Sequence, residues 1–237
     1  MNLSGSCVVT GGEYDEIISI AGSCKINGNI KCPEIKCSGS VKADGDIVCT
    51  GSIETAGSFH SLGSVKADIF FKTAGVASIE GNLKCETLKS SGSLHIGEGI
   101  EAENVMIGGT IVCRGLLNAE KTDIKIFDDC NVGSIGGGKI TITLAEEKKE
   151  KKEKKRLPLF TMLTKTDHAP TSAPTFTVDE SIEGDTIALE YVKAPLVIGR
   201  VVAIGAGCVI DTIRYQDEIE ISPEAKVGRT EKENQNS

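Results

Sequence analysis

The sequence predicts an all-β protein, a parallel β-helix (β-solenoid) with 17–18 residues in each turn, and three observations predict this fold. Apolar and polar residues alternate between the glycines, which is the pattern of strands with one buried face. Aromatic residues make up only 4% of the chain and Trp is absent, which favours a core of thin, regular layers. Glycines recur every 17 or 18 residues, at Gly5, Gly22, Gly39, Gly57, Gly75, Gly92 and Gly109.

Each turn is predicted to hold three short strands. Apolar residues stand two and four positions after a first-series glycine, as Cys24 and Ile26 do, and again eight and ten positions after it, as Ile30 and Cys32 do. A third apolar position follows at Ile35 and its equivalents. We expect the glycines to occupy the bends, where φ is often positive. A second glycine series follows the first by six residues, at Gly11, Gly28, Gly45, Gly63, Gly81 and Gly115.

The chain divides into four segments by composition. Residues 1–144 carry 12 basic and 17 acidic groups and form a β-helix of about eight turns, roughly 35–40 Å long at about 4.8 Å per turn. Residues 145–175 form a charged linker or loop. Residues 176–229 are further β-helix turns that stack on the first part or continue it, because so short a segment buries too little surface alone. Residues 230–237 are a disordered tail.

The bulk composition excludes several classes of protein. The net charge of −8 disfavours binding to nucleic acid. No stretch approaches the roughly 20 apolar residues of a membrane span, and Met1–Gly5 does not begin a signal peptide, so we expect a cytoplasmic protein. The nine cysteines contain no CxxC pair, which predicts no disulfide framework and no zinc site. We expect Cys24, Cys32, Cys49 and Cys85 to be buried and reduced, and we expect no cofactor.

Two segments carry a resemblance to a known family. Ile20-Ala21-Gly22-Ser23-Cys24-Lys25-Ile26-Asn27-Gly28-Asn29-Ile30 and Val41-Lys42-Ala43-Asp44-Gly45-Asp46-Ile47 resemble the repeats of the bactofilins, polymer-forming cytoskeletal proteins of bacteria. The resemblance implies a right-handed, triangular β-helix that joins end to end into filaments without nucleotide. It also implies a scaffold, not an enzyme, that organises client proteins at the membrane and influences cell shape, polarity or motility. The interrupted solenoid departs from the family pattern.

The end turns of a solenoid expose unpaired backbone groups, so we expect the ends to make the homopolymer contacts. The far end depends on whether residues 176–229 stack on the first part or fold aside. The predicted contact residues are Cys7, Val9, Ile18 and Ile20 at one end, and at the other Ile219, Ile221 and Val227 if the segment stacks, or Phe127 and Val132 if it folds aside.

A basic island followed by apolar residues predicts a peripheral membrane contact. Basic side chains attract anionic lipid at about 1 kcal/mol each, and apolar side chains then insert shallowly. The alternative is a solvated charged linker whose apolar residues pack on the rod. The residues concerned are Lys148, Lys149, Lys151, Lys152, Lys154, Lys155, Arg156, Leu157, Leu159 and Phe160.

Two other kinds of site remain open. One segment looks like the hexapeptide repeat of left-handed β-helix acyltransferases: Ile204-Gly205-Ala206-Gly207-Cys208-Val209-Ile210. These enzymes use a histidine as general base, and the candidates here are His60, His95 and His168. The alternative is that these are solvated surface histidines. Asp68, Glu86, Glu103 and Glu120 each follow their repeat glycine by eleven residues. They predict a column of carboxylates that could hold a divalent cation, or else a solvated edge balanced by Lys66 and Lys84.

Overall fold

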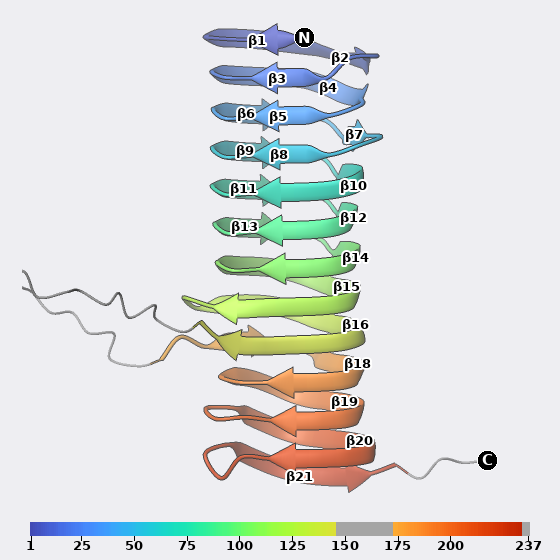
Figure 1. Cartoon of the computed structure of the whole chain (residues 1–237), viewed down its shortest axis with the longest axis vertical. Helices are drawn as coiled ribbons and strands as arrows, with labels where there is room; N and C mark the ends of the chain where they lie inside the picture. Colours follow the sequence, from blue (N-terminus) through green and yellow to red (C-terminus); the bar gives the residue numbers. More distant parts are fainter. Residues whose placement is uncertain (146–172, 234–237) are drawn as a thin grey trace, which may run out of the picture.

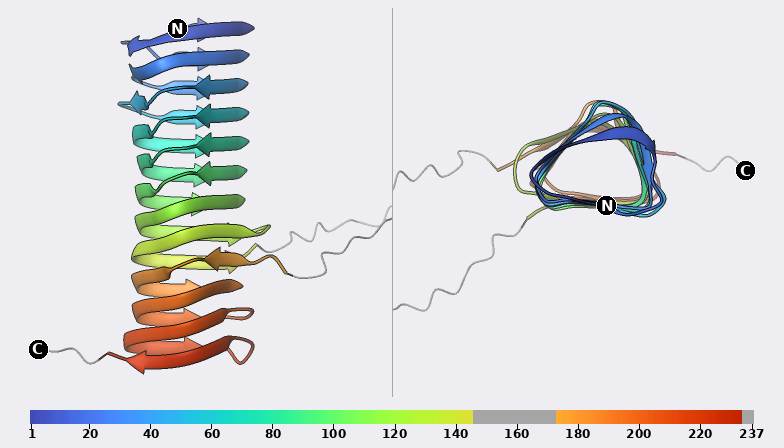
Figure 2. Two further views of the ribbon diagram at one scale, coloured as in Figure 1. Left: turned by 180° about the vertical axis from the view of Figure 1, so that it is seen from behind. Right: turned by 90° about the horizontal axis from the view of Figure 1, so that it is seen from above.

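The computed structural model describes residues 1–145 and 173–233, and every regular element in these residues is a β-strand. The strands pair in parallel and build one solenoid of about 12 turns (Figure 1). The predicted fold class is therefore confirmed. Seen along its axis, the solenoid has the outline of a rounded triangle (Figure 2). The chain enters at one end of the rod and leaves at the other.

In chain order the strands are β1 (Asn2–Leu3), β2 (Ser6–Glu13), β3 (Ile18–Ile20), β4 (Ser23–Cys32), β5 (Ile35–Cys37), β6 (Ser40–Ala43), β7 (Ile47–Cys49), β8 (Ile53–Thr55), β9 (Ser58–Ser61), β10 (Val65–Thr73), β11 (Val76–Ile79), β12 (Leu83–Ser90), β13 (Ser93–Ile96), β14 (Ile100–Ile107), β15 (Thr110–Ile126), β16 (Cys130–Leu144), β17 (Phe176–Val178), β18 (Ser181–Leu189), β19 (Val192–Ile204), β20 (Val209–Ile221) and β21 (Lys226–Lys232).

One turn shows how the triangle is built. β6, β7 and β8 lie on its three sides, which we call sides one, two and three. β6 pairs with β9 on side one, while β7 and β8 pair with the two halves of β10 on sides two and three. In other turns neighbouring strands fuse around a corner, so that β4, β15 and β16 each run over more than one side.

The core consists of stacked inward columns. The structure shows the alternation of buried and exposed side chains that the sequence predicts. In β4, Lys25 is exposed, whereas Ile26, Ile30 and Cys32 are buried. The largest fully buried side chains include Phe59, Phe71 and Phe176. The rings of Phe59 and Phe71 meet edge to face with centroids 5.7 Å apart.

The first glycine series lies at the corner between sides three and one, which we call the glycine corner. Positive φ is not the main reason for glycine here, contrary to the expectation from sequence: in this series the left-handed region is occupied at Gly5 alone (φ 76°). The reason is close approach. A Cβ built on Gly57 would stand 1.9 Å from the carbonyl oxygen of Gly39, and one on Gly75 would stand 2.0 Å from that of Gly57. Glycine stacks on glycine because no side chain fits between the turns.

A ladder of side chains stabilises the corner between sides one and two. The Asn29 Oδ1 atom accepts a hydrogen bond from the Asp46 amide at 2.9 Å, and Asp46 Oδ1 accepts one from the Ser64 amide at 2.8 Å. In the next turns Ser64 Oγ accepts a hydrogen bond from the Asn82 amide at 3.1 Å, and Asn82 Oδ1 accepts one from the Gly99 amide at 3.0 Å. These side chains satisfy backbone donors at a bend where strand pairing is interrupted.

Residues from Phe176 onward continue the same rod. β16 pairs with β17 through Cys130 and Phe176, and with β18 through Ile140 and Ile187. The predicted disordered tail begins too early, because Thr230 and Lys232 belong to β21 and pair with Ile213 and Tyr215. Residues 146–172, which make up most of the predicted linker, and residues 234–237 lie outside the described residues.

Candidate functional site: the two ends of the rod

The backbone at each end of the rod has one unpaired edge. Within the described residues, β1 pairs with β3 alone and β2 with β4 alone. At the other end β21 pairs with β20 alone, and residues 218–221 of β20 pair with β19 but with nothing beyond them. Exposed strand edges of this kind present free N–H and C=O groups to another chain. Both ends therefore have the backbone groups needed to pair with a further turn.

The N-terminal end presents fewer of the predicted residues than the sequence suggested. Cys7 is half-buried there, but Val9 is 4% exposed, and Ile18 and Ile20 belong to the second turn and are fully covered. Ile18 and Ile20 are core residues because the first turn extends upstream to Leu3, which pairs with Ile20. Val9 lies in the end strand β2, but its side chain is buried in the core.

Sequence reasoning missed two residues at this end, Leu3 and Tyr14. Both are partly buried and pack against the core. The hydroxyl of Tyr14 donates a hydrogen bond to the carbonyl of Thr10 at 2.7 Å, which holds the ring within the end turn. Leu3 could have been found from the period, since it stands 17 residues before Ile20.

The C-terminal end presents Ile219, Ile221 and Val227, as the stacking alternative predicts. Ile221 is 39% exposed, and Ile219 and Val227 are half-buried against the core. Phe127 and Val132 do not lie at an end. Val132 is buried against Val178, and Phe127 is 60% exposed on the wall, because the rod continues past them through β17 to β21.

One inward column links the two ends. It begins at Leu3, passes through Ile20, Cys37 and the equivalent position of every later turn, and finishes at Ile221. Its first and last members are aliphatic and incompletely covered. A second rod placed against either end would cover apolar surface as well as a free strand edge.

The basic island and the apolar residues after it, Lys148 to Phe160, lie outside the described residues. No helix formed by the described residues is long and apolar enough to span a bilayer. The predicted membrane contact is therefore a hypothesis that rests on the sequence alone.

The histidines are placed on the wall of the rod. His60 and His95 lie in one outward column on side one, two turns apart, with Ser78 between them. His95 borders a hollow of about 150 Å3 together with Glu80 and Arg114. Among the described residues neither imidazole has a hydrogen-bond partner that would orient it as a general base. His168 lies outside the described residues.

The four carboxylates Asp68, Glu86, Glu103 and Glu120 line one groove of about 780 Å3 at the corner between sides two and three. Lys66 contacts Asp68 at 2.9 Å, and Lys84 pairs with Glu101. No three His, Cys, Asp or Glu side chains among residues 1–145 and 173–233 are placed to hold a metal ion. The corner is an acidic edge balanced by lysines.

The nine cysteines are free thiols, and all except Cys7 are buried, including the four singled out from the sequence. Burial raises the pKa of Cys24 to about 12 and that of Cys85 to about 12. The Sγ atoms of Cys32 and Cys49 lie 3.5 Å apart in adjacent turns. That contact lowers the pKa of Cys32, because the Cys49 thiol donates to its thiolate, and raises the pKa of Cys49. The column is apolar packing, as its alternation with Ala67 indicates.

Comparison with known proteins identifies one weak relative. The chain is 29% identical over 114 residues to YhbF, an uncharacterized protein of Bacillus subtilis (strain 168). The match covers 48% of this chain and 40% of that protein, so the chain spans less than half the length of the relative. No family model matches the chain, and no solved structure matches it. No activity is carried over from these comparisons.

Proposed function

We propose that this protein is a bacterial cytoskeletal scaffold that polymerises end to end without nucleotide and organises client proteins. One observation carries the proposal: both ends of the rod combine an unpaired strand edge with incompletely buried aliphatic side chains of the core columns. Stacking of a second rod would repeat between chains the pairing that joins turns within the chain.

The contact needs no nucleotide, because neither end must be exposed by hydrolysis. The repeats' resemblance to the bactofilins supports the same conclusion. The walls carry exposed ion pairs, such as Lys31–Glu13 and Arg200–Asp217, which offer neither a free strand edge nor exposed core side chains to a second rod. Exposed pairs of this kind are screened over about 10 Å in 0.1 M salt.

The test is to place a charge at each end and to compare it with the same substitution on a wall. Leu3→Arg is matched by Leu62→Arg, since Leu62 is 51% exposed on the wall. Ile221→Arg is matched by Ile69→Arg, which is also 51% exposed. Leu3 is the suitable target at the N-terminal end, because an arginine at the buried Val9 would disturb folding.

We expect wild type, Leu62→Arg and Ile69→Arg to form filaments by negative-stain electron microscopy, while Leu3→Arg and Ile221→Arg give short folded rods. Circular dichroism confirms that the end variants remain β-structured. A wild-type protein that stays monomeric across salt and concentration contradicts the proposal, as do end variants that polymerise like wild type.

A membrane-associated location, cytoplasmic and peripheral, is the second part of the proposal and rests on the sequence of residues 148–163. Anionic vesicles should sediment the wild-type protein but not a deletion of 148–163. Neutral phosphatidylcholine vesicles are the control, and equal binding of both proteins to anionic vesicles removes this part of the proposal without affecting the filament.

A further inference from the structure

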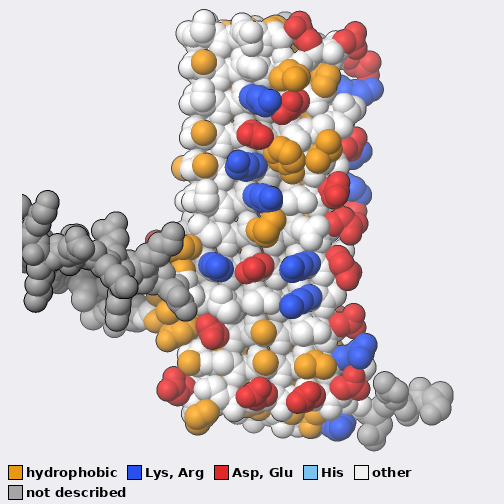
Figure 3. Space-filling model, in the orientation of Figure 1, with side chains coloured by type: hydrophobic (Ala, Val, Ile, Leu, Met, Phe, Trp, Pro, Cys, Tyr) orange, Lys and Arg blue, Asp and Glu red, His pale blue; other side chains and the backbone are white. Residues whose placement is uncertain are grey.

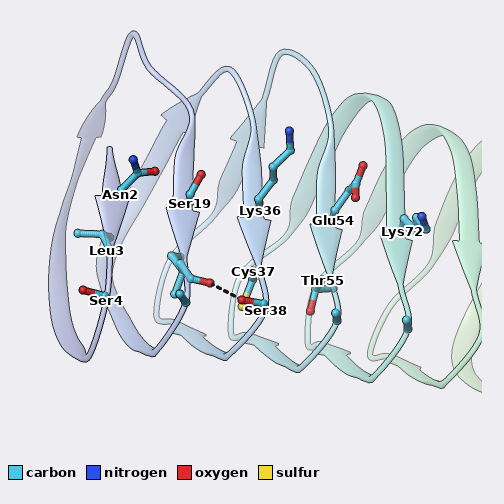
Figure 4. A pocket seen from close by; sticks show the side chains of 14 residues that line it. Asn2, Leu3, Ser4, Ser19, Lys36, Cys37, Ser38, Glu54, Thr55 and Lys72 are labelled. Carbon is cyan, nitrogen blue, oxygen red and sulfur yellow. Dashed lines mark hydrogen bonds between the residues drawn. The ribbon is translucent and has the colours of Figure 1, made fainter.

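An apolar groove runs along the glycine corner on the outside of side three. One wall of the groove is formed by small corner residues, such as Ala56 and Ala74, and the other by the outward column that contains Lys36, Glu54 and Lys72 (Figure 4). The hollow measures about 620 Å3 over β1, β3, β5, β8 and β10. A second hollow of about 410 Å3 shares Lys72 and continues the groove to Gly108.

The space-filling view shows why this strip is unusual on the rod. Charged side chains stand in a column down the middle of the front face, and the upper turns to the left of that column carry apolar and uncharged side chains (Figure 3). Backbone hydrogen bonds join the corner residues of successive turns, such as the one that the Ala56 amide donates to the carbonyl of Cys37 at 2.8 Å, so the groove is rigid. An apolar strip exposed on the outside of a protein is a candidate interaction site.

A protruding phenylalanine closes the groove at its C-terminal end. The turn from Val112 to Asn131 spans 19 residues, whereas the turn from His95 to Val112 spans 17. The longer turn pushes the corner outward between β15 and β16 (Figure 1). Phe127 is 60% exposed there, with Asp128 and Asp129 exposed beside it. Its ring borders Gly108, where an added Cβ would lie 3.7 Å from Cε2.

We propose that a second copy of this chain binds the groove side by side and antiparallel, with Phe127 of each rod inserted beside Ala56 and Ala74 of the other. Four turns separate Ala56 from Phe127 along the corner, about 19 Å at about 4.8 Å per turn. A two-fold axis midway between them brings each Phe127 onto the other groove, which makes the contact self-complementary.

Charge favours this occupant. The charged side chains that line the groove are four basic and two acidic ones, so the groove carries a net positive charge: Lys36, Lys72, Lys89, Lys125, Glu54 and Asp123. Among the described residues Lys72 and Lys89 form no ion pair, and the same is true of Asp128 beside the ring. Antiparallel pairing therefore sets acidic side chains next to Phe127 against lysines next to the groove. The apolar segment 157–163 of the same chain suits the groove less well, because the basic island 148–156 is attached to it.

The experiment uses the full chain with Leu3→Arg and Ile221→Arg, so that sedimentation reports sideways pairing alone. We expect this protein to form a dimer. Adding Phe127→Ser should weaken the dimer at least about 100-fold, because both copies lose a ring. Lys72→Asp and Asp128→Lys should each weaken it, and the double reversal should restore it, since both copies then carry the exchanged pair. Leu116→Ser, at an exposed leucine on another corner, is the control.

Several outcomes overturn the proposal. The proposal is wrong if the protein with Leu3→Arg and Ile221→Arg stays monomeric at every concentration. It is also wrong if the dimer survives Phe127→Ser, or if the double reversal at Lys72 and Asp128 fails to restore the dimer. Thiol labelling of an Ala74→Cys variant tests whether the chain's own segment 157–163 occupies the groove instead. If deletion of 148–163 speeds the labelling and Phe127→Ser does not, the groove holds that segment and the proposal is wrong. Thermal unfolding checks that each variant is folded.

Discussion

The chain crosses the glycine corner differently in the two parts of the rod, residues 1–145 and 173–233. In the first part, from Gly22 to Gly109, the chain turns sharply through stacked glycines, where an added Cβ would stand 1.9–2.1 Å from the carbonyl oxygen of the glycine one turn before. The last crossing of this part, at 127–129, is wider and contains no glycine. In the second part the same corner is crossed by Tyr191 at φ 55° and by wider loops at 205–208 and 222–225. The comparison shows that the strict repeat is a requirement of the tight corner and not of the solenoid as such.

The sharpest test of this difference uses two neighbouring glycines. A Cβ on Gly109 would stand 2.1 Å from the carbonyl oxygen of Gly92, whereas one on Gly108 meets nothing closer than Phe127 at 3.7 Å. We expect Gly109→Ala to lower the free energy of unfolding by more than about 4 kcal/mol and Gly108→Ala to change it by less than about 1 kcal/mol. Denaturant unfolding measures both, and similar losses for the two variants would show that close approach does not explain the series.

The second test concerns the aromatic residues of the two parts. Phe59 and Phe71 contact each other in the first part, while Phe176 in the second part stacks between Cys130 and Val192. Phe71→Ala and Phe176→Ala should each cost about 3–4 kcal/mol. A double-mutant cycle on Phe59 and Phe71 should add a coupling of about 0.5–1.5 kcal/mol. Phe71 and Phe176 should show no coupling. A measurable coupling between these two residues would show that the layers are not independent.

The third test uses alkaline pH, because most buried thiols lie in the first part. The pKa of Cys85 is raised by burial from 9.0 to about 12. The native state therefore keeps a proton that the unfolded state loses. This contribution to stability is complete below about pH 9 and disappears as the pH rises to about 12. Cys85→Ala should lose less stability than wild type between pH 8 and pH 11, and an equal loss would show that the thiol does not contribute.

The smallest expected effect comes from buried hydroxyls that occur in the first part. Thr73 is 1% exposed, and its Oγ1 has no hydrogen-bond partner. Thr73→Val should raise the free energy of unfolding by about 1 kcal/mol, because it removes an unpaired polar atom without changing the shape. Ser61→Ala serves as the control, since its Oγ does bond, to the carbonyl of Gly45 at 3.3 Å. A loss of stability in Thr73→Val would indicate that the hydroxyl has an unseen partner.

Much of the fold could be predicted because a solenoid repeats its local constraints. Each inward column appears in the sequence many times, so Ile26, Ala43 and Ile79 identify one another as members of one buried column. The ends could be predicted only in part, because an end is where the repeat stops. Leu3 and Tyr14 pack against the core in the first turn, but no earlier turn covers them.

The amino-acid sequence by itself determined the parallel solenoid, its period of 17–18 residues and the burial of the cysteine columns. These follow from the alternation of side chains and from glycine spacing, which are local properties. Only the tertiary structure decided that residues 173–233 continue the rod, that Phe127 lies on a wall and not at an end, and that the glycines are required by close approach. Each of these depends on which residues face one another across turns, and the local sequence does not specify those contacts.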